Sequence, residues 1–504
     1  MSQKILQHIS LTDELISISR IISNSGVSSY IVGGFIRDSL IGIKTVDIDI
    51  AVSNKVSEIG TLLAKKTNGK CITLDKKRNI YRVITGTLYS NIQIDIVEAA
   101  TGIKNDLMNR DFTINSMAIN MSNVAKMSKT TIGIKDIIDP YNGIKDLESN
   151  KLQLTSPNSL REDPVRLIRA IRISSQLNLE ISSTLKDAIF EQSHLINKPA
   201  RERIRAEFLN ILNQKNSSKW LREMDSLGLL TQIIPEIEHA KGVSQSKEHY
   251  WDVFNHLIES VNKIEKIFEY CLSKNPQSTT IGTQFMSQIP TYPTIDCHFN
   301  SIAGNGHTRV TASKLACLLH DISKPETKTI EETGRIRFLK HAEKGAKISE
   351  IILKNLKCSN SLINIVSSQI LYHLRPGQIS QKSEMPSEKA IKKYYRDLGT
   401  VAIDTLYLNM ADYLAAKGPL LEQSDWEKYC LVINDILKNG LNKNIPDKIP
   451  NLISGQDIMD KLNLNPGPLI GNILTKVQDA QEDGIIKNKE EALKYIEKFT
   501  SLGE

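Results

Sequence analysis

Two different spacings of apolar residues divide the chain. The first 150 residues contain short, β-branched runs in which apolar and polar positions alternate, such as SSYIVGG, TVDIDIAV and IQIDIVEAA. This alternation predicts strands that bury one face. From about residue 160 onward, apolar residues recur every three or four positions, as in EDPVRLIRAIRISSQL, which predicts amphipathic helices. Together the patterns predict an α+β fold, with a head of mixed sheet and helices followed by a mostly α-helical body.

The length of the chain and its irregular stretches predict several domains. A chain of 504 residues is too long for a single hydrophobic core. The stretch 273–309 has no clear period and predicts a loop or insertion, and LNKNIPDKIPN predicts a second break. We expect four domains: a head over 1–150, a helical neck over 151–240, a third domain over 241–425 and a helical tail over 426–504.

Composition places few limits on the partners of the protein. The net charge of +7 permits an anionic partner such as RNA without demanding one. The six cysteines are scattered and form no C-x-x-C pair, which argues against a structural zinc site or a disulfide framework. The N-terminal residues 1–23 mix charges with apolar residues and predict a helix instead of a signal peptide. No apolar run is long enough to span a membrane, so we expect a soluble, cytoplasmic protein.

Two carboxylates lie inside a stretch that otherwise reads as a buried strand. In VDIDI, Asp47 and Asp49 alternate with Val46, Ile48 and Ile50. Alternate side chains of a strand share a face, so the two acids should point one way and the apolar residues should fill the core. Ionised carboxylates in such a place are costly unless a cation pairs with them.

A second strand, NIQIDIVEAA, carries Asp95 in the same setting. Three convergent carboxylates on neighbouring strands would form a site suited to Mg²⁺, which also takes ligands from substrate phosphates. Two such ions roughly 4 Å apart activate an attacking hydroxyl and stabilise a leaving pyrophosphate. We therefore predict Asp47, Asp49 and Asp95 as catalytic residues, with Asp47 and Asp49 as ligands of Mg²⁺.

A glycine pair precedes these acids. Gly33 and Gly34 follow the strand YIV and precede the predicted helix FIRDSLIG. Paired glycines let the backbone approach a triphosphate closely, and a helix N-terminus favours anions. Taken alone, the glycines fit a tight turn beside solvent-facing acids on an edge strand. Followed at this distance by D-x-D within one strand, they indicate a nucleotide site.

Four motifs in order resemble the class II tRNA nucleotidyltransferase and bacterial poly(A) polymerase family: GGFIRD, DIDI, DLMNRDFTINSMA and REDPVRLIRAIRISSQL. The similarity continues through ERIRAEFLNIL, LLTQIIPEIEHAKGVSQ and LISGQDIMDKLNLNPGPLIGNIL, so it covers nearly the whole chain. It implies a nucleotidyltransferase head and a neck and tail that bind tRNA. The implied reaction is template-independent addition of C and A to the tRNA 3′ end from CTP and ATP, with release of pyrophosphate.

The resemblance also implies roles for single residues. Arg110 and Asp111 resemble the family's sugar-contacting pair; an isolated Arg-Asp is otherwise a surface salt bridge, and the flanking FTIN favours the sugar role. Asp163 and Arg166, three apart on a predicted helix that Pro164 begins, resemble residues that select the base; a helix cap with an ion pair is the alternative. The nucleotide-binding residues are expected to be Gly33, Gly34, Arg37, Arg110, Asp111, Asp163, Arg166 and Arg169.

The sequence departs from the family pattern at three places. Asn109 stands where the family normally has a second arginine, and Ser116 stands where it has alanine. Ten residues separate Asp95 from Asp106, where many members carry a longer loop that is associated with the switch from C to A addition. Addition of CC only, addition of A only and poly(A) synthesis are therefore alternatives. Three residues are expected only to stabilise helices: Glu202, Arg203 and Glu207.

The helical body contains an ordered set of histidines and aspartates that resembles the HD superfamily of metal-dependent phosphohydrolases. His320 and Asp321 are the namesake pair, and Lys324 is placed to contact a phosphate. Imidazole and carboxylate ligands suit a transition metal such as Mn²⁺ or Ni²⁺. Hydrolysis of phosphomonoesters or 2′,3′-cyclic phosphates is thus an alternative or second activity, and an RNA-binding scaffold is the other alternative. The predicted metal ligands are His256, His320, Asp321, His341, His373 and Asp412. The remaining histidines, His249 among them, have no predicted role.

Overall fold

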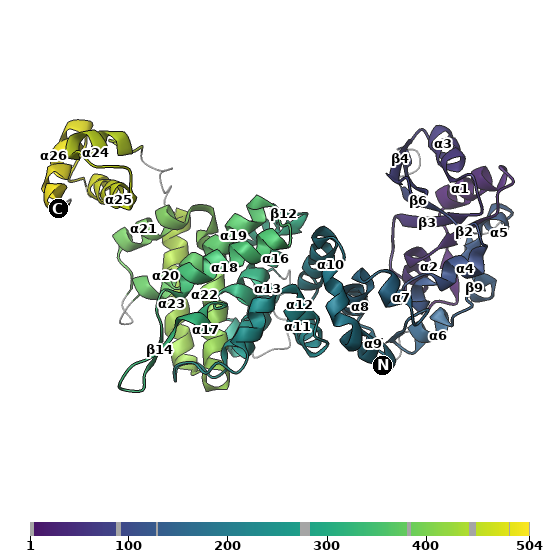
Figure 1. Cartoon of the computed structure of the whole chain (residues 1–504), viewed down its shortest axis with the longest axis horizontal. Coiled ribbons are helices and arrows are strands. Elements are labelled where there is room, and N and C mark those ends of the chain that lie inside the picture. The colour runs from purple at the N-terminus through teal and green to yellow at the C-terminus, as the bar shows by residue number, and fades with distance from the viewer. Residues whose placement is uncertain are drawn as a thin grey trace. The chain divides into compact units, whose positions relative to one another are not determined.

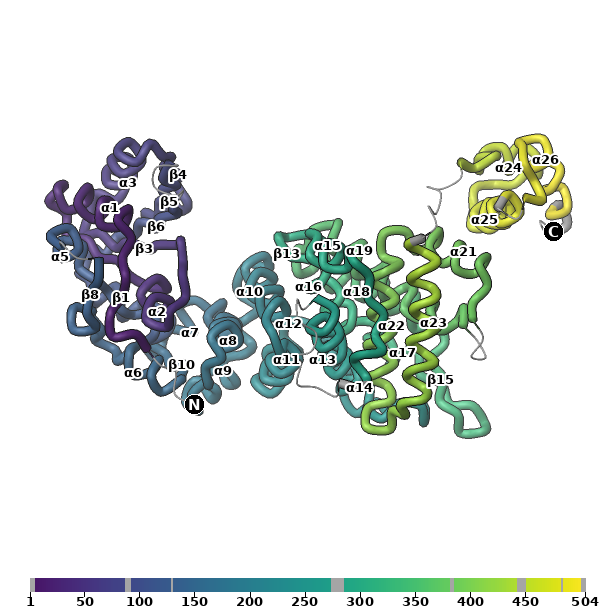
Figure 2. The backbone as a smooth tube through the Cα atoms, turned by 180° about the vertical axis from the view of Figure 1, so that it is seen from behind, coloured from purple at the N-terminus to yellow at the C-terminus, as the bar shows by residue number. Residues whose placement is uncertain are grey.

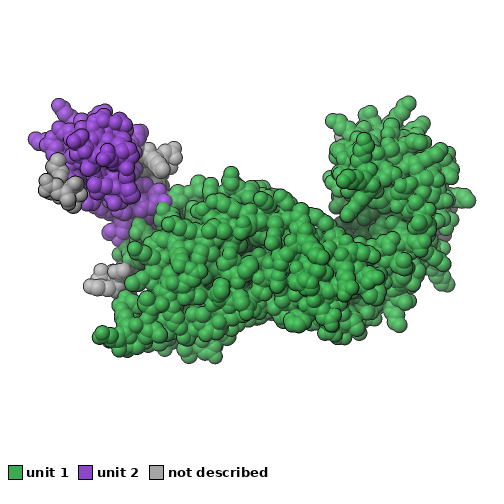
Figure 3. Space-filling view, viewed as in Figure 1, with its two compact units in different colours: residues 1–386, 398–437 green, residues 387–397, 438–504 purple. Residues whose placement is uncertain are grey.

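The structure is a computed structural model that describes residues 5–86, 92–127, 130–272, 283–380, 385–442, 450–482 and 484–502. The chain forms two compact units, coloured separately in Figure 3. The larger unit contains residues 1–386 and 398–437, and the smaller contains residues 387–397 and 438–504. Within the described ranges, no helix is long and apolar enough to cross a bilayer.

A seven-stranded mixed sheet forms the centre of the head (Figure 1). Its strand order is β4-β5-β6-β3-β2-β7-β9, and β3 and β6 form its parallel pair while the other neighbours are antiparallel. The mixed sheet expected for the head is confirmed. The strands are β2 (Ser29–Val32), β3 (Asp47–Val52), β4 (Lys70–Asp75), β5 (Ile80–Ile84), β6 (Gln93–Glu98), β7 (Ala118–Asn120) and β9 (Ile137–Ile138).

Two expectations for the head are wrong in detail. Residues His8–Ser10 form strand β1, which pairs with β8 (Thr131–Gly133), so the N-terminal segment is not helical throughout. The side chain of Val46 is 65% exposed, because it precedes the first residue of β3, whereas Ile48 and Ile50 are buried. The helices of the head are α1 (Asp13–Ser23), α2 (Gly34–Leu40), α3 (Val56–Lys66), α4 (Ile103–Met108), α5 (Met121–Ala125) and α6 (Gly143–Glu148).

Helices make up the rest of the larger unit, as the 3.6-residue period predicts. The first group follows the parallel strands β10 (Lys151–Leu152) and β11 (Glu180–Ile181) or lies between them. Its members are α7 (Ser159–Glu162), α8 (Val165–Leu177), α9 (Ser183–Gln192), α10 (Arg201–Asn213), α11 (Ser217–Ser226) and α12 (Leu229–Ile233).

In a second group of helices, the long helix α13 packs against α16 and α22, and α19 packs against both of these and against α18 (Figure 2). The group contains α13 (Val253–Cys271), α16 (Arg309–Leu319), α17 (Lys324–Thr327), α18 (His341–Asn355), α19 (Asn360–Tyr372), α20 (Arg375–Ile379), α22 (Ala402–Lys417) and most of α23 (Gln423–Asn442). A hairpin of β14 (Lys328–Ile330) and β15 (Ile336–Phe338) precedes α18.

The irregular connection predicted over 273–309 is only partly irregular. Residues 273–282 lie outside the described residues, and the remainder contains regular elements. These are α14 (Thr283–Met286), α15 (Ile295–Asn300) and the hairpin of β12 (Ile302–Gly304) and β13 (His307–Thr308). The predicted break at LNKNIPDKIPN falls largely on residues 443–449, which the structure does not describe.

The smaller unit has a core of its own. Ile458, Ile473 and Ile496 lie at its centre and are almost completely buried. Asp479 accepts hydrogen bonds from Lys393 and Arg396, both at 3.0 Å, which tie α21 to α25. The helices of this unit are α21 (Glu388–Leu398), α24 (Gly455–Leu462), α25 (Pro468–Glu482) and α26 (Lys489–Ile496).

Candidate active sites in the head and in the helical body

Neighbouring strands bring the predicted carboxylates of the head to one face of the sheet. The register of the parallel strands β3 and β6 places Asp49 directly beside Asp95 and Asp47 beside Gln93. Because alternate residues of a strand share a face, Asp47 lies on the same side as Asp49 and Asp95. The side chain of Asp47 is exposed, and those of Asp49 and Asp95 are half-buried.

The surroundings of Asp49 favour a bound cation. Burial raises the pKa of Asp49 above its ordinary value; the Arg110 guanidinium opposes this, and the charges of Asp95 and Asp47 add to it. A divalent ion would relieve the mutual repulsion of the acids, and carboxylate oxygens are the donors that hard cations prefer. Asp47 and Asp49 therefore fit a divalent metal ion.

Asp95 fits such an ion less well. Its two oxygens accept hydrogen bonds from one guanidinium, with Arg82 Nε at 2.7 Å from Oδ1 and Arg82 Nη2 at 2.8 Å from Oδ2. No sequence motif predicts a role for Arg82. Its partner lies 13 residues away on the next strand, and only the strand register, which the sequence does not specify, reveals the contact.

Gly33 allows a close approach that no other residue permits. It lies between β2 and α2 with φ +78°, and a Cβ atom there would lie 2.7 Å from Asp49 Oδ2 and 2.9 Å from Arg110 Nη1. A side chain would therefore be strained in its backbone and would also displace the acid or the guanidinium. The position of Asp49 therefore requires glycine at residue 33.

An arginine-rich cleft of about 520 Å³ opens beside Gly33 and Asp49. Its basic lining residues are Arg37, Arg78, Arg110, Arg166, Arg169 and Arg172. Guanidinium groups are well matched to phosphate oxygens in charge and in geometry. The lining therefore suits a polyanionic ligand such as a nucleoside triphosphate.

Several predicted nucleotide-binding residues in this cleft are engaged within the protein. Arg37 is 8% exposed and donates to Asp38 Oδ1 at 2.8 Å and to Asn115 Oδ1 at 2.6 Å. Arg110 donates to Asp106 Oδ2 at 3.1 Å. Asp111 accepts a hydrogen bond from Asn115 Nδ2 at 2.9 Å. The two residues of the predicted sugar-contacting pair thus have separate partners, and both line the cleft.

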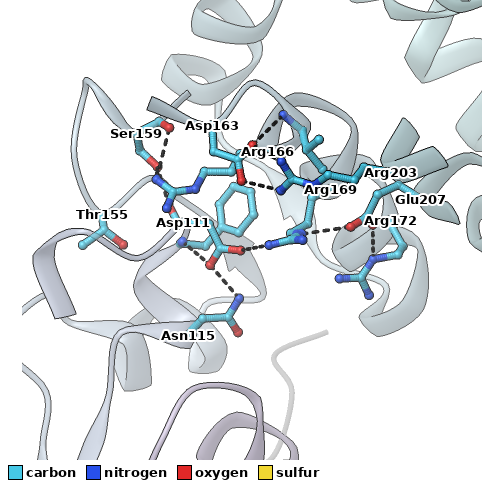
Figure 4. Close-up of polar contacts among 12 residues, drawn as sticks. Asp111, Asn115, Thr155, Ser159, Asp163, Arg166, Arg169, Arg172, Arg203 and Glu207 are labelled. Atoms are coloured by element: carbon cyan, nitrogen blue, oxygen red, sulfur yellow. Dashed lines mark hydrogen bonds and ion pairs between the residues drawn. The ribbon is translucent and has the colours of Figure 1, made fainter. Parts of the chain in front are cut away.

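The predicted base-selecting residues are held by partners of their own (Figure 4). Asp163 accepts a fork from Arg203, with Nη1 at 3.0 Å from Oδ1 and Nη2 at 2.6 Å from Oδ2. Burial alone would raise the pKa of Asp163, but the hydrogen bonds and charge of Arg203 outweigh it, so the pKa lies below its ordinary value. Arg203 was expected only to stabilise a helix, and the structure places it at the site instead.

The backbone around Asp163 also differs from the prediction. Asp163 follows α7 with an extended backbone of φ −141°, and α8 begins only after Pro164. Arg166 lies in the first turn of α8, where Nη1 donates to Ser159 Oγ at 2.8 Å and Nη2 donates to the Asn109 carbonyl at 2.7 Å. The two residues therefore do not share one helix face.

Arg169, also on α8, links a residue of the head to a residue of the neck. Arg169 Nη1 lies 3.5 Å from Asp111 Oδ2, and Arg169 Nε donates to Glu207 Oε1 at 2.9 Å. Arg172 binds the other oxygen of Glu207 (Figure 4). Glu207 thus orients two arginines that line the cleft.

In the helical body, the structure brings together all six predicted HD residues. Donor atoms of His256, His320, Asp321 and Asp412 lie within 4.8 Å of one another, and so do those of Asp321, His341 and His373. Asp321 belongs to both groups. Its Oδ2 is 3.3 Å from Nε2 of His256 and of His320, and its Oδ1 is 3.4 Å from Nε2 of His341. The six side chains would hold a divalent metal ion.

Backbone carbonyls orient three of the imidazole rings. His320 Nδ1 lies 2.9 Å from the Cys317 carbonyl oxygen, and His341 and His373 make the same contact with Phe338 and Ile370, both at 2.6 Å. These contacts place the proton on Nδ1 and leave Nε2 as the free ligand atom. The donor set therefore fits a transition metal ion.

A cavity of about 550 Å³ opens onto this cluster. Lys324 lines it, donating to Gln245 Oε1 at 2.6 Å and lying 2.6 Å from Asp321 Oδ2. His249, which has no predicted role, also lines the cavity, and its Nε2 is 3.3 Å from Lys324 Nζ. Burial, aided by the charge of Lys324, lowers the pKa of His249 to about 4. His249 lies in the loop that precedes α13, so no helical spacing from His256 indicates it in the sequence.

Three models of known protein families match successive segments of the chain. Family models match residues 29–153 (Poly A polymerase head domain), residues 178–241 (Probable RNA and SrmB- binding site of polymerase A) and residues 298–417 (HD domain). The HD match includes Asp321 and begins after His256.

Relatives resemble the chain over nearly its whole length. An A-adding tRNA nucleotidyltransferase from Deinococcus radiodurans is 25% identical over 476 residues, which cover 93% of this chain and 95% of that protein. A CC-adding tRNA nucleotidyltransferase from Thermus thermophilus is 26% identical over 475 residues, or 92% of each chain. A Thermotoga maritima CCA-adding enzyme complexed with tRNA superposes with a TM-score of 0.54 at 20% identity, covering 98% of this chain and 99% of that one. The structural likeness confirms the predicted α+β fold class.

Proposed function

We propose, on the premise that this chain belongs to the class II tRNA nucleotidyltransferase and poly(A) polymerase family, that it adds C and A nucleotides to the tRNA 3′ end. CTP and ATP are the donors, and pyrophosphate is released. The observation that carries the proposal is the close approach of Gly33 to Asp49 and Arg110 at the mouth of an arginine-rich cleft. The cytoplasm, where tRNA is matured, is the proposed location.

The residues of the head divide the chemistry among them. Asp47 and Asp49 would hold Mg²⁺, which when bound activates the attacking 3′-hydroxyl and neutralises the phosphates. Gly33 lets the triphosphate approach the backbone, and Arg110 balances its charge. The remaining arginines of the cleft orient the nucleotide through its phosphates and sugar.

Base selection is assigned to Asp163 and Arg166. Between them they offer acceptor oxygens and guanidinium donors, which is what recognition of a base edge requires. Arg203 fixes the carboxylate of Asp163, while Ser159 and the Asn109 carbonyl fix Arg166. These partners act as supports that set the direction in which the selecting groups point.

Binding of tRNA is assigned to the neck and the tail. The neck contains the match to the probable RNA-binding segment over 178–241. Lysines and arginines would contact phosphates, so tRNA affinity should fall as salt concentration rises.

Assays with truncated tRNA test this proposal. Transcripts that end before CCA, after C and after CC are incubated with Mg²⁺ and one nucleoside triphosphate at a time. Ordered incorporation of CMP and then AMP supports addition of CCA; incorporation restricted to CMP or to AMP identifies the narrower CC-adding or A-adding activity. The relatives include both narrower activities. Persistent AMP incorporation on unrelated RNA identifies a poly(A) polymerase, and no incorporation contradicts the proposal.

A second candidate activity belongs to the helical body. The convergence of six metal-ligand side chains beside a cavity that Lys324 lines supports metal-dependent hydrolysis of phosphomonoesters or 2′,3′-cyclic phosphates. A metal such as Mn²⁺ or Ni²⁺ lowers the pKa of a bound water and so supplies a hydroxide nucleophile. Lys324 would contact the phosphate of the substrate.

A further inference from the structure

One carboxylate of the head is occupied by a cation that the chain itself supplies. Asp95 on β6 lies directly opposite Arg82 on β5, and the guanidinium engages both of its oxygens, at 2.7 and 2.8 Å. A fork of this kind is stronger and more specific in geometry than a single contact. Because both residues lie within the sheet, the strands also hold the pair in place.

Charge repulsion argues against a metal ion at Asp95. A divalent cation bound there would lie next to the Arg82 guanidinium, and like charges repel strongly where water is partly excluded. The side chain of Asp95 is 26% exposed and that of Arg82 is 37% exposed, so solvent screens the repulsion only in part.

Asp47 and Asp49 differ from Asp95 in this respect. Within the described residues, neither of them lies in an arginine fork. Asp49 is the direct cross-strand neighbour of Asp95, so an uncompensated charge on Asp95 would act on it at short range. The state of the Arg82–Asp95 pair thus sets the electrostatic field in which Asp49 binds a metal ion.

We propose that Arg82 is a positioning residue of the head: by neutralising Asp95, it leaves Asp47 and Asp49 as the two carboxylates that bind the divalent metal ion. This inference rests on the proposed nucleotidyl transfer. It replaces the expectation that Asp95 takes part in metal binding, because Asp95 holds Arg82 instead.

Charge-balanced variants test the inference. Arg82→Gln, Asp95→Asn and the double variant are compared for their affinity for Mn²⁺ in the presence of a non-hydrolysable CTP analogue, and for CMP incorporation into a tRNA transcript. Every chain, including the wild-type reference, carries Asp321→Asn, which removes the Mn²⁺ site of the helical body. The uncompensated carboxylate in Arg82→Gln should tighten Mn²⁺ binding about tenfold, and the uncompensated guanidinium in Asp95→Asn should weaken it about tenfold. In the double variant both readouts should return to within about threefold of the wild type.

Two results would overturn the inference. Equal losses of Mn²⁺ affinity in Asp95→Asn and in the double variant would make Asp95 a metal ligand. Equal losses of incorporation in Arg82→Gln and in the double variant, at unchanged Mn²⁺ affinity, would make Arg82 a substrate contact. Incorporation by the wild type is measured first, so failure of the proposed function is distinguished from failure of this inference.

Controls separate these effects from loss of folding. Thermal unfolding is followed for each variant, and Arg82→Lys, which keeps the positive charge, takes the place of Arg82→Gln if the latter does not fold. We expect Arg82→Lys to bind Mn²⁺ with an affinity near that of the wild type. Lys186 and Glu223 form an ion pair at 2.7 Å in the neck. Lys186→Gln, Glu223→Gln and their double variant should leave Mn²⁺ affinity and incorporation unchanged.

Discussion

The arginine-rich cleft of the head and the cavity beside the HD residues differ in how far their charged side chains are exposed to solvent. In the head, Asp49 lines an open cleft together with arginines, and Asp47 on the same strand is exposed. In the body, the side chains of His256 and His320 are completely buried and that of Asp321 is 2% exposed. With the proposed metal ligands, the head would leave part of the ligand set to the substrate, whereas the body would supply nearly all of it from the chain.

This difference matches the metals proposed for the two sites. Mg²⁺ loses water reluctantly and binds through one or two carboxylates together with substrate phosphates. Imidazole ligands with oriented rings form a closed set that binds transition metals before any substrate arrives. A change at one site should therefore leave the other intact, because different elements carry the two sets of ligands.

The largest effect is expected from a substitution in the head that abolishes nucleotide addition but leaves the HD site unchanged. Asp49→Asn keeps the shape of the side chain but removes the charge that holds Mg²⁺, so nucleotide addition should fall at least about a thousandfold. Phosphate release by the HD site should not change. Glu58→Gln, at an exposed acid of the same domain, is the control and should retain addition. Addition that survives Asp49→Asn would remove Asp49 from the metal site.

The reciprocal change acts on the HD site. Asp321→Asn removes the carboxylate that both donor groups share, so bound Mn²⁺ and the hydrolytic opening of a 2′,3′-cyclic nucleotide to its phosphomonoester should both be lost, by about a hundredfold or more. Incorporation of CMP into tRNA should stay at the wild-type level. Glu350→Gln, at a partly exposed residue of α18, is the control. Ring opening that persists in Asp321→Asn would place the hydrolytic site elsewhere.

A smaller effect tests why the head requires a glycine. Gly33→Ala should lower nucleotide addition about tenfold to a hundredfold, because its methyl group would displace Asp49 or Arg110. Gly26 provides a matched control, since it has φ +76° but no atom within 4 Å of its Cβ position. Both variants should lose about 1 kcal/mol of stability from the left-handed backbone. Equal nucleotide addition by the Gly33 and Gly26 variants would show that the close approach at Gly33 does not contribute to function.

Some features of these sites are predictable from the sequence and others are not. The D-x-D alternation places Asp47 and Asp49 on one face because strand periodicity is a local property. The same reasoning fails at Val46, which precedes the first residue of the strand. Order along the chain was enough to select the six HD residues, since their chemistry is distinctive.

The partners of these residues were not predictable in the same way. Arg82 reaches its site through strand register, Arg203 through helix packing and His249 through the path of the loop before α13, and all three depend on the whole fold. Arg203 lies 40 residues from Asp163, and no local pattern links the two. Sequence motifs thus identify groups that do chemistry more readily than groups that orient them.

The smallest expected effect concerns one of these orienting groups. Arg203→Gln removes the fork on Asp163, so the carboxylate should lose its fixed direction and discrimination between CTP and ATP should fall about fivefold to tenfold. The measurement is the ratio of kcat/KM for the two nucleotides on each tRNA transcript. Arg201→Gln, on the same helix, is the control, because Arg201 donates to Asn197 and not to Asp163. Unchanged discrimination in Arg203→Gln would reject the supporting role of Arg203.

The stability of the same variant should depend on pH in a defined direction. The pKa of Asp163 is lowered from its ordinary value of 3.8 in the folded protein, where Arg203 outweighs the effect of burial. A group with a lowered pKa stabilises the fold above its ordinary pKa, and this contribution is lost as the pH falls through the lower value. The free energy of unfolding of the wild type should exceed that of Arg203→Gln by less than about 1 kcal/mol at pH 7, since the arginine side chain is 44% exposed. The difference should persist to pH 5 and shrink below pH 3.8; a difference that grows as the pH falls would mean that Arg203 stabilises the fold through contacts other than Asp163.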